Sequence, residues 1–276
     1  MALIDLDEVT KSYPSRHGTI SIINGVSFSI ADNDFLAIVG PSGCGKSTML
    51  RLIQGLDRPT SGRITFRGRP MEGVSTEMAL VFQSFALFPW LTVSENVAFG
   101  LRARGASPER IASQVERYVS VTGLVGFEEA YPRELSGGMR QRVGLARALA
   151  VEPAVLLMDE PFSSLDPLTA EGLRDEVLQL WQDPQLPPEA VVLVTHNIEE
   201  ALMMADRMIV LSRRPSRVLA GVPVNLPRPR DRKSAAFYEL TDYVYSLITE
   251  GGGPANPSLD GSRESALPAS TPPTLP

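Results

Sequence analysis

Cysteine is almost missing from this sequence of 276 residues, in which Cys44 is the one example. A single cysteine cannot form an intramolecular disulfide, so a disulfide-stapled secreted domain is excluded and a reducing cytosol is the expected setting. Cys44 lies in a glycine-rich stretch just before a predicted helix. It is either a small residue that fits a tight turn or a thiol whose pKa is lowered by the helix N-terminus.

Long apolar runs and an excess of positive charge are also missing. No run approaches the ~20 apolar residues that a membrane-spanning helix requires, and the first residues lack the basic segment that opens a signal peptide. The formal net charge is −6, so no overall positive field would attract nucleic acid, and we expect no nucleic-acid partner. We therefore expect a globular chain for which any membrane span is supplied by another protein.

One short stretch between an apolar strand and a helix contains the most specific motif. It fits G-x-x-x-x-G-K-[ST] and consists of Gly40, Pro41, Ser42, Gly43, Cys44, Gly45, Lys46, Ser47 and Thr48. Glycines let successive N–H groups point inward, and the helix that begins near Lys46 adds the positive end of its dipole. In this motif Lys46 reaches the β- and γ-phosphates, and the Ser47 hydroxyl binds the bridging Mg²⁺. The sequence therefore predicts a site for a nucleoside triphosphate and Mg²⁺.

The rest of the chain alternates between strands and helices, with one helical interruption. Residues 3–9 and 20–30 are predicted to be antiparallel strands, with a turn at Asn24-Gly25. We divide the chain into a nucleotide-binding α/β domain at 1–230, a helical subdomain inserted at about 90–150, a C-terminal helix at 231–250 and a tail at 251–276. The tail is rich in Gly, Pro and Ser and lacks aromatic residues, which predicts disorder.

Three predicted strands end in polar side chains that suit phosphate chemistry. Gln83 ends an apolar strand, where ligands of open α/β sheets collect, so it could hold Mg²⁺ or an attacking water. Asp159 and Glu160 end another strand: Asp159 could hold Mg²⁺ through water, and Glu160 could accept a proton from attacking water. His196 ends a third strand and could hydrogen-bond a γ-phosphate. Alone, each residue has an ordinary structural interpretation, but beside a phosphate loop the two acids are more often catalytic.

Three further segments could contact a nucleotide or a second subunit. Ser136, Gly137 and Gly138 open a helix whose free N–H groups suit an anion. Asp166 precedes the next helix, either as its N-cap or as a contact to a second subunit. The Tyr13 ring could stack on a base, although a surface tyrosine before a proline is equally possible.

The segment Phe85 to Leu91 combines three aromatic side chains and a proline where a loop would ordinarily be polar. From its residues alone it is either an extension of the core or an exposed surface for a partner helix.

Together these motifs resemble the nucleotide-binding subunits of ATP-binding cassette (ABC) transporters over about residues 3–225. The resemblance rests on Gly40 to Thr48, Gln83, Leu135 to Met139, Val155 to Pro161, Asp166 and His196. It implies an α/β fold: a P-loop NTPase core with a mixed β-sheet, an antiparallel β-subdomain and an inserted α-helical subdomain. It also implies that ATP is hydrolysed, that Tyr13 stacks on adenine, that Glu160 is the catalytic base and that His196 senses the γ-phosphate.

The resemblance also implies partners. In ABC ATPases the Ser-Gly-Gly segment of one subunit closes over ATP held by the other, so a head-to-tail homodimer or pseudo-dimer is expected. Phe85 to Leu91 would then contact a transmembrane permease, and a separate solute-binding protein would complete the complex. The chain would lie at the cytoplasmic face of the bacterial inner membrane as a peripheral subunit.

Residues 87–93, 137–142, 180–181 and 211–215 look most like the importer branch for nitrate, sulfonate, taurine and related small solutes. Met139 stands where Gln is commoner in the family, Asn197 where Asp usually follows the histidine, and Ser163 where that branch often has Gly. These departures remove no catalytic group but blur the substrate. The alternative interpretations are a soluble ABC ATPase acting on ribosomes or in DNA repair, or a subunit of an exporter.

Overall fold

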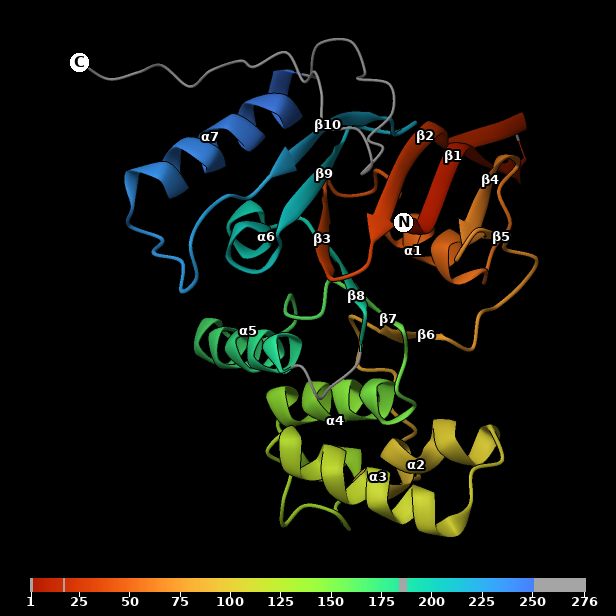
Figure 1. Ribbon diagram of the computed structural model, residues 1–276, viewed down its shortest axis with the longest axis vertical. Helices are drawn as coiled ribbons and strands as arrows, with labels where there is room; N and C mark the ends of the chain where they lie inside the picture. The colour runs from red at the N-terminus through yellow and green to blue at the C-terminus, as the bar shows by residue number, and fades with distance from the viewer. Residues whose placement is uncertain (1, 17, 184–187, 251–276) are drawn as a thin grey trace.

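Two β-sheets and the helices around them make up the computed structural model, which describes residues 2–16, 18–183 and 188–250. The tail predicted at residues 251–276 lies outside these ranges. The two sheets and a separate group of helices agree with the predicted fold class (Figure 1).

The smaller sheet is antiparallel, with strand order β2-β1-β4-β5. Its strands are β1 (Ala2–Ser15), β2 (Gly18–Ala31), β4 (Ser61–Phe66) and β5 (Arg69–Pro70). The turn predicted at Asn24-Gly25 is wrong, because β2 continues through these residues and the chain reverses between Ser15 and Gly18 instead. Gly25, with φ of +63°, lies where the register between β1 and β2 shifts, so it accommodates an irregularity in a long ribbon rather than a reversal.

The larger sheet is mixed, with strand order β10-β9-β3-β8-β7-β6. Its strands are β3 (Asp34–Val39), β6 (Met78–Val81), β7 (Val155–Asp159), β8 (Ala190–Thr195), β9 (Arg207–Leu211) and β10 (Val218–Pro223). All neighbours are parallel except β9 and β10, which pair antiparallel. Every residue of β3 and β8 is buried, which explains their continuous apolar sequences, since a parallel strand is covered on both faces.

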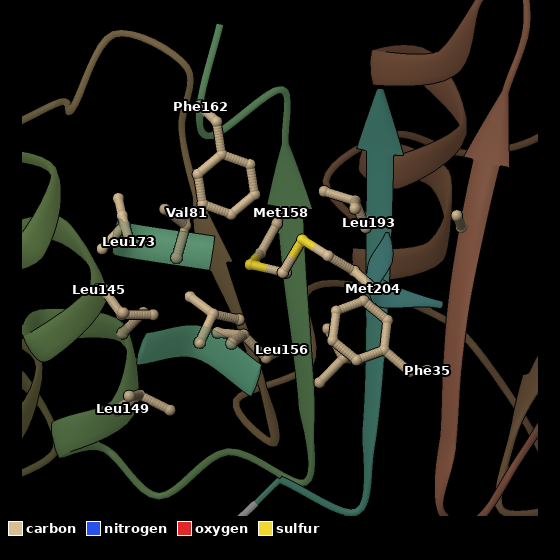
Figure 2. Packing of buried hydrophobic residues seen from close by; sticks show 14 of the residues in the cluster. Phe35, Val81, Leu145, Leu149, Leu156, Met158, Phe162, Leu173, Leu193 and Met204 are labelled. Carbon is tan, nitrogen blue, oxygen red and sulfur yellow. The ribbon is translucent and has the colours of Figure 1, made fainter. Parts of the chain in front are cut away.

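The larger sheet separates two apolar cores. In β3, Phe35 and Ala37 belong to one core, whereas Leu36 and Ile38 belong to the other, as expected when successive side chains point to opposite faces. The first core packs against helices; Figure 2 shows Phe35 and Met204 beside strand residues of β7 and β8. The second core lies between the larger sheet, the smaller sheet and α1 (Lys46–Gln54).

The remaining helices form two groups. In the first, α2 (Val93–Ala103), α3 (Pro108–Val121) and α4 (Gly137–Ala150) pack on one another in the lower part of Figure 1. In the second, α5 (Pro167–Gln182) and α6 (Ile198–Met204) cover the sheet, and α7 (Ala235–Glu250) packs on α6, β9 and β10. A short 3-10 helix covers Pro132–Glu134. Within the described ranges, no helix has the length and apolar character needed to cross a membrane.

The strand order brings three carboxyl ends together. β8 lies between β3 and β7, with Val39 opposite Thr195 and Asp159 opposite Val194. The segments that leave these three strands therefore emerge side by side at one edge of the sheet, where open α/β folds place their ligands.

Candidate nucleotide-binding site

The loop of residues 40–45 leads into α1, whose first turn has no side-chain cap. Gly43 and Gly45 have φ of +74° and +113°, a region that favours glycine. A Cβ on Gly45 would lie only 2.8 Å from Ile22 Cγ2, so the loop packs tightly on β2. No side chain caps the N-terminus of α1, whereas a side-chain oxygen accepts a first-turn N–H group in each of α2 to α6. The start of α1 is therefore open to an external anion.

Lys46 places its ammonium group over this loop. The side chain is 4% exposed, and Nζ donates to the carbonyl oxygens of Gly40 (2.9 Å) and Pro41 (3.1 Å). Nζ also lies 3.9 Å from Glu160 Oε1. A compact buried cation next to uncapped N–H groups suits a polyphosphate.

Ser47 and Asp159 form a pair of oxygen ligands at the next turn of the site. Ser47 Oγ donates to Asp159 Oδ1 at 2.9 Å. Burial raises the pKa of the Asp159 carboxyl, and the charge of Glu160 adds to this effect, while the bond from Ser47 opposes it. A divalent cation bound here would favour the charged form of the Asp159 carboxyl, which burial and Glu160 disfavour. Among the described residues, no group of three or more His, Cys, Asp or Glu is arranged to hold a metal ion. Mg²⁺ in such sites commonly keeps several waters and binds substrate phosphates beside one or two carboxylates.

Glu160 and His196 contact each other at the ends of β7 and β8. His196 Nδ1 lies 3.0 Å from Glu160 Oε2, and the His196 side chain is 51% exposed while that of Glu160 is 19% exposed. Glu160 has a φ of +47°, and its N–H donates to Val194 O at 2.9 Å. The contact leaves Nε2 of His196 for another ligand and holds a carboxylate beside Lys46, the arrangement needed for a base near a phosphate.

Gln83 joins this group through Ser163, which the sequence analysis noted as a departure from the importer branch but did not place in the site. Gln83 Nε2 donates to Ser163 Oγ at 3.0 Å, and Ser163 Oγ donates to the backbone oxygen of Glu160 at 2.9 Å. The Ser164 hydroxyl donates to Gln83 O at 3.4 Å. The segments after β6 and β7 are thus connected at the same edge of the sheet.

Tyr13 lies within β1, not between two strands as expected, and its side chain is half-buried. Its hydroxyl donates to Asp57 Oδ2 at 2.5 Å, and Lys11 Nζ donates to Asp57 Oδ1 at 2.5 Å and lies 4.7 Å from the centre of the Tyr13 ring. Burial raises the pKa of Tyr13, and the bond to Asp57 adds to this effect, whereas a bond with Thr48 opposes it. The ring therefore stands beside α1 in a fixed orientation. Sequence reasoning missed Lys11 and Asp57, because nothing in the sequence relates these two distant positions.

Cys44 is fully buried in the loop, where its N–H donates to Pro41 O at 3.2 Å. Burial raises the pKa of its thiol, and the nearby Lys46 only partly opposes this effect. The structure thus contradicts the reactive-thiol interpretation and favours a small residue that fits a tight turn.

The start of α4, with Ser136 and Gly138, lies away from the phosphate loop of the same chain. Ser136 Oγ accepts from Met139 N at 3.2 Å at the start of α4, and α4 lies with α2 and α3, apart from α1 (Figure 1). Asp166 Oδ1 accepts from Thr169 N at 3.0 Å, and these Thr169 bonds lower the pKa of Asp166. A Cβ on Gly138 would lie 2.4 Å from Thr169 Cγ2, which is too close, whereas a Cβ on Gly137 would meet no atom nearer than 3.6 Å.

The segment from Phe85 to Leu91 is partly exposed and held from behind by α2. Trp90 is 69% exposed, and the Phe88 ring contacts those of Phe99 and Trp90 at tilted angles, with centroids 4.2 and 5.7 Å away. A groove lies between α2 and α3, and most of its lining surface is apolar. Its lining includes Ser94, Ala98, Ile111, Val115, Val119 and Glu128. Exposed aromatic side chains beside an apolar groove are typical of a protein-binding surface.

Comparison with known proteins gives consistent matches. The family model described as "ABC transporter" matches residues 23–163. The nitrate import ATP-binding protein NrtD of a Synechocystis species is 40% identical over 254 residues, which are 89% of this chain and 94% of that protein. The aliphatic sulfonates import ATP-binding protein SsuB of Bacillus cereus is 37% identical over 249 residues, 90% of this chain and 97% of that protein. The solved dimeric structure of the ATP-binding cassette MJ0796 in a post-hydrolysis state, bound to ADP and Pi, is 34% identical with a TM-score of 0.71, and the match covers 80% of this chain and 99% of that one.

Proposed function

Because the chain belongs to the ABC transporter family, whose ATP-binding subunits are ATPases coupled to transport, we propose that it powers solute import through a separate permease. The solutes we propose are small ones of the nitrate, sulfonate and taurine type. The observation that supports the ATPase most strongly is the uncapped start of α1 beside Asp159, Glu160 and His196 on neighbouring strand ends. The names of the two import relatives support the solute class.

In this proposal, each part of the site has one role. The free backbone N–H groups at the start of α1 and the Lys46 ammonium group hold the phosphates, and the Tyr13 ring stacks on adenine. Ser47, Asp159 and Gln83 would hold Mg²⁺, which neutralises charge on the β- and γ-phosphates when it is bound.

Glu160 and His196 supply the proton chemistry. The Glu160 carboxylate accepts a proton from the water that attacks the γ-phosphorus. His196 Nδ1 contacts Glu160 Oε2, and Nε2 would contact a γ-phosphate oxygen. Because both of these oxygens accept, the imidazole holds the base and the phosphate together when both of its nitrogens carry a proton.

We propose that the second half of each site comes from a second copy of the chain. Ser136, Gly137 and Gly138 open α4, which lies apart from α1 and its phosphate loop within one chain (Figure 1). A head-to-tail dimer would place them over the γ-phosphate of the partner, with Asp166 at the same interface. The dimeric state of the MJ0796 structure supports this arrangement.

We further propose that Phe85 to Leu91 and the adjoining groove receive a helix of the permease. The exposed Trp90 and the apolar lining of the groove support a largely apolar partner. The subunit would then lie at the cytoplasmic face of the bacterial inner membrane, with a separate solute-binding protein in the complex. In this assembly residues 1–230 form the ABC ATPase domain, with the helical subdomain at about 90–150, and 231–250 form an appended helix.

The test uses the variant Glu160→Gln, which keeps the shape of the side chain but removes the base. The tagged variant is expressed in its native host, membranes are mildly solubilised with ATP and Mg²⁺ present, and co-purifying chains are identified. We expect no ATP turnover and recovery of a multi-span permease; the double variant Lys46→Ala, Glu160→Gln should recover less of it, because Lys46→Ala weakens ATP binding. Near-normal ATPase activity of Glu160→Gln would remove it as the base. Recovery with ribosomes, nucleic acid or no partner would overturn the transporter assignment.

A further inference from the structure

A buried ion pair lies behind His196 and has no role in the chemistry above. Glu200 is the third residue of α6, and Arg174 projects from α5; Arg174 Nη1 and Glu200 Oε2 are 3.7 Å apart, with side chains 12% and 7% exposed. Burial raises the pKa of Glu200, and Arg174 opposes this effect. Burying two charges is costly, so a pair of this kind is weak evidence for stability and calls for another explanation.

The Glu200 carboxylate holds the backbone on both sides of His196. It hydrogen-bonds with the Thr195 side chain, and Thr195 Oγ1 in turn accepts from Asn197 N at 3.0 Å. Asn197 Oδ1 accepts from Glu200 N at 3.1 Å, which closes the network. His196 stands between Thr195 and Asn197, so its position depends on the network that Glu200 completes.

The same carboxylate ties His196 to a helix that begins at the proposed dimer interface. Arg174 belongs to α5, and α5 begins at Pro167, directly after its cap Asp166. The ion pair between Arg174 and Glu200 therefore connects the strand end that carries His196 with the helix that Asp166 opens.

We propose that Glu200 is a positioning residue that, together with Arg174, holds His196 against Glu160 for ATP hydrolysis. The proposal rests on the proposed function, because it assumes that His196 and Glu160 act on ATP. Glu200 itself contacts neither nucleotide nor water in this account. Its loss should therefore lower the rate of the chemical step and leave nucleotide binding to Lys46 and the phosphate loop unchanged.

The kinetic test compares Glu200→Gln, Arg174→Met and the double variant. Removing a positioning contact should lower kcat about tenfold and leave KM for ATP within about twofold, because the contact matters in the transition state more than in binding. Since both residues act through one ion pair, the double variant should be no slower than the slower single variant. Arg174→Lys keeps the charge and should restore most of the rate.

Two matched controls separate positioning from general loss of structure. Glu199→Gln removes the exposed acid next to Glu200 and should leave kcat unchanged. Asp34→Asn breaks another buried ion pair, with Arg207, at the amino-terminal end of β3; it should lower the melting temperature without lowering kcat per folded molecule. An unchanged kcat in Glu200→Gln, single-variant losses that multiply, or an equal kcat loss in Asp34→Asn would overturn the proposal.

A second readout does not depend on hydrolysis. The chain has two histidines, so the imidazole NMR signal of His196 can be assigned by comparison with a His17→Gln variant. Glu200→Gln should shift that signal, whereas Glu199→Gln should not. If the wild-type protein has no ATPase activity, the proposed function is overturned, but the NMR signal still tests whether Glu200 positions His196. If the signal of His196 does not move in Glu200→Gln, the positioning role of Glu200 is overturned and the proposed function is not affected.

Discussion

At the scale of single residues, Cys44 allows a direct test of burial in the phosphate loop. Burial raises the pKa of its thiol, so at any given pH a smaller fraction is thiolate than in a free thiol, and reactivity should rise only at higher pH. We expect Ellman's reagent at pH 8 to modify the native protein at least ~10-fold more slowly than the chain unfolded in guanidinium, because only the thiolate attacks.

Glutathione under both conditions controls for effects of guanidinium on the reagent. Because Cys44 is the single cysteine, all absorbance change from the protein reports this position. Labelling of the native chain as fast as that of glutathione would contradict the buried geometry.

The residues of the site divide by how they could be found in the sequence. Lys46, Glu160 and His196 were found because each belongs to a short local pattern or ends an apolar run. Asp57, which holds the Tyr13 hydroxyl, and Ser163, which links Gln83 to Glu160, were not found. Tyr13 and Asp57 lie far apart in the chain, as do Gln83 and Ser163, so these contacts exist only once the sheets have formed.

At the scale of elements, Asn96 on α2 decides whether the segment from Phe85 to Leu91 keeps its shape. Asn96 is fully buried; Oδ1 accepts from Phe88 N, and Nδ2 donates to the backbone oxygens of Phe88, Leu91 and Thr92. Asn96→Ala would leave these backbone groups without their partner, which we expect to cost about 3 kcal/mol of unfolding free energy. The midpoint of urea unfolding measures this loss.

Asn96→Ala should weaken binding of the permease more than binding of ATP. Nucleotide affinity should stay near that of the wild type, because the phosphate loop lies on another element, while recovery of the permease should fall. Glu239→Ala, on an exposed position of α7 away from the groove, is the control and should change neither property. An Asn96→Ala variant with wild-type stability would show that water satisfies these groups equally well.

The elements themselves were predictable where one physical signal dominates. The buried strands β7 and β8 follow from continuous apolar runs, and α3 from its serine cap and the proline at its first turn. The turn predicted at Asn24-Gly25 was wrong because a local preference for positive φ also suits an irregular register inside a long ribbon. The pairing of β2 with β1 decides whether Asn24-Gly25 forms a turn or an irregularity within a strand. A short window of sequence around these two residues does not contain that pairing.

In the whole molecule, the starts of α1 and α4 both suit phosphate, and they lie apart within one chain. The start of α1 is uncapped, and the start of α4 lies with the other helical group in Figure 1. The sequence indicates both starts, yet their separation depends on how α2 to α4 pack against the sheet. In the proposed dimer, the start of α4 from a second copy of the chain would face each phosphate loop.

Gly137 gives the means to test this dimer without disturbing the fold. A Cβ at Gly137 would lie 3.6 Å from Leu165 Cδ2, an ordinary contact, and Gly137 is the first residue of α4. An acidic side chain there is favourable for the helix dipole, but it would repel a phosphate from the partner. Gly137→Asp should therefore fold and bind ATP as a monomer, yet fail to close a dimer.

In the Glu160→Gln background, dimers that form with ATP should persist because hydrolysis cannot release them. Light scattering should show monomers for Gly137→Asp alone and for Lys46→Ala alone. A mixture of the two should form heterodimers, because pairing one intact phosphate loop with one intact Ser136-Gly137-Gly138 segment completes a single site, and each dimer should retain one ATP. Closed dimers of Gly137→Asp alone would contradict the shared site, and a mixture that stays monomeric would show that both sites must be filled together.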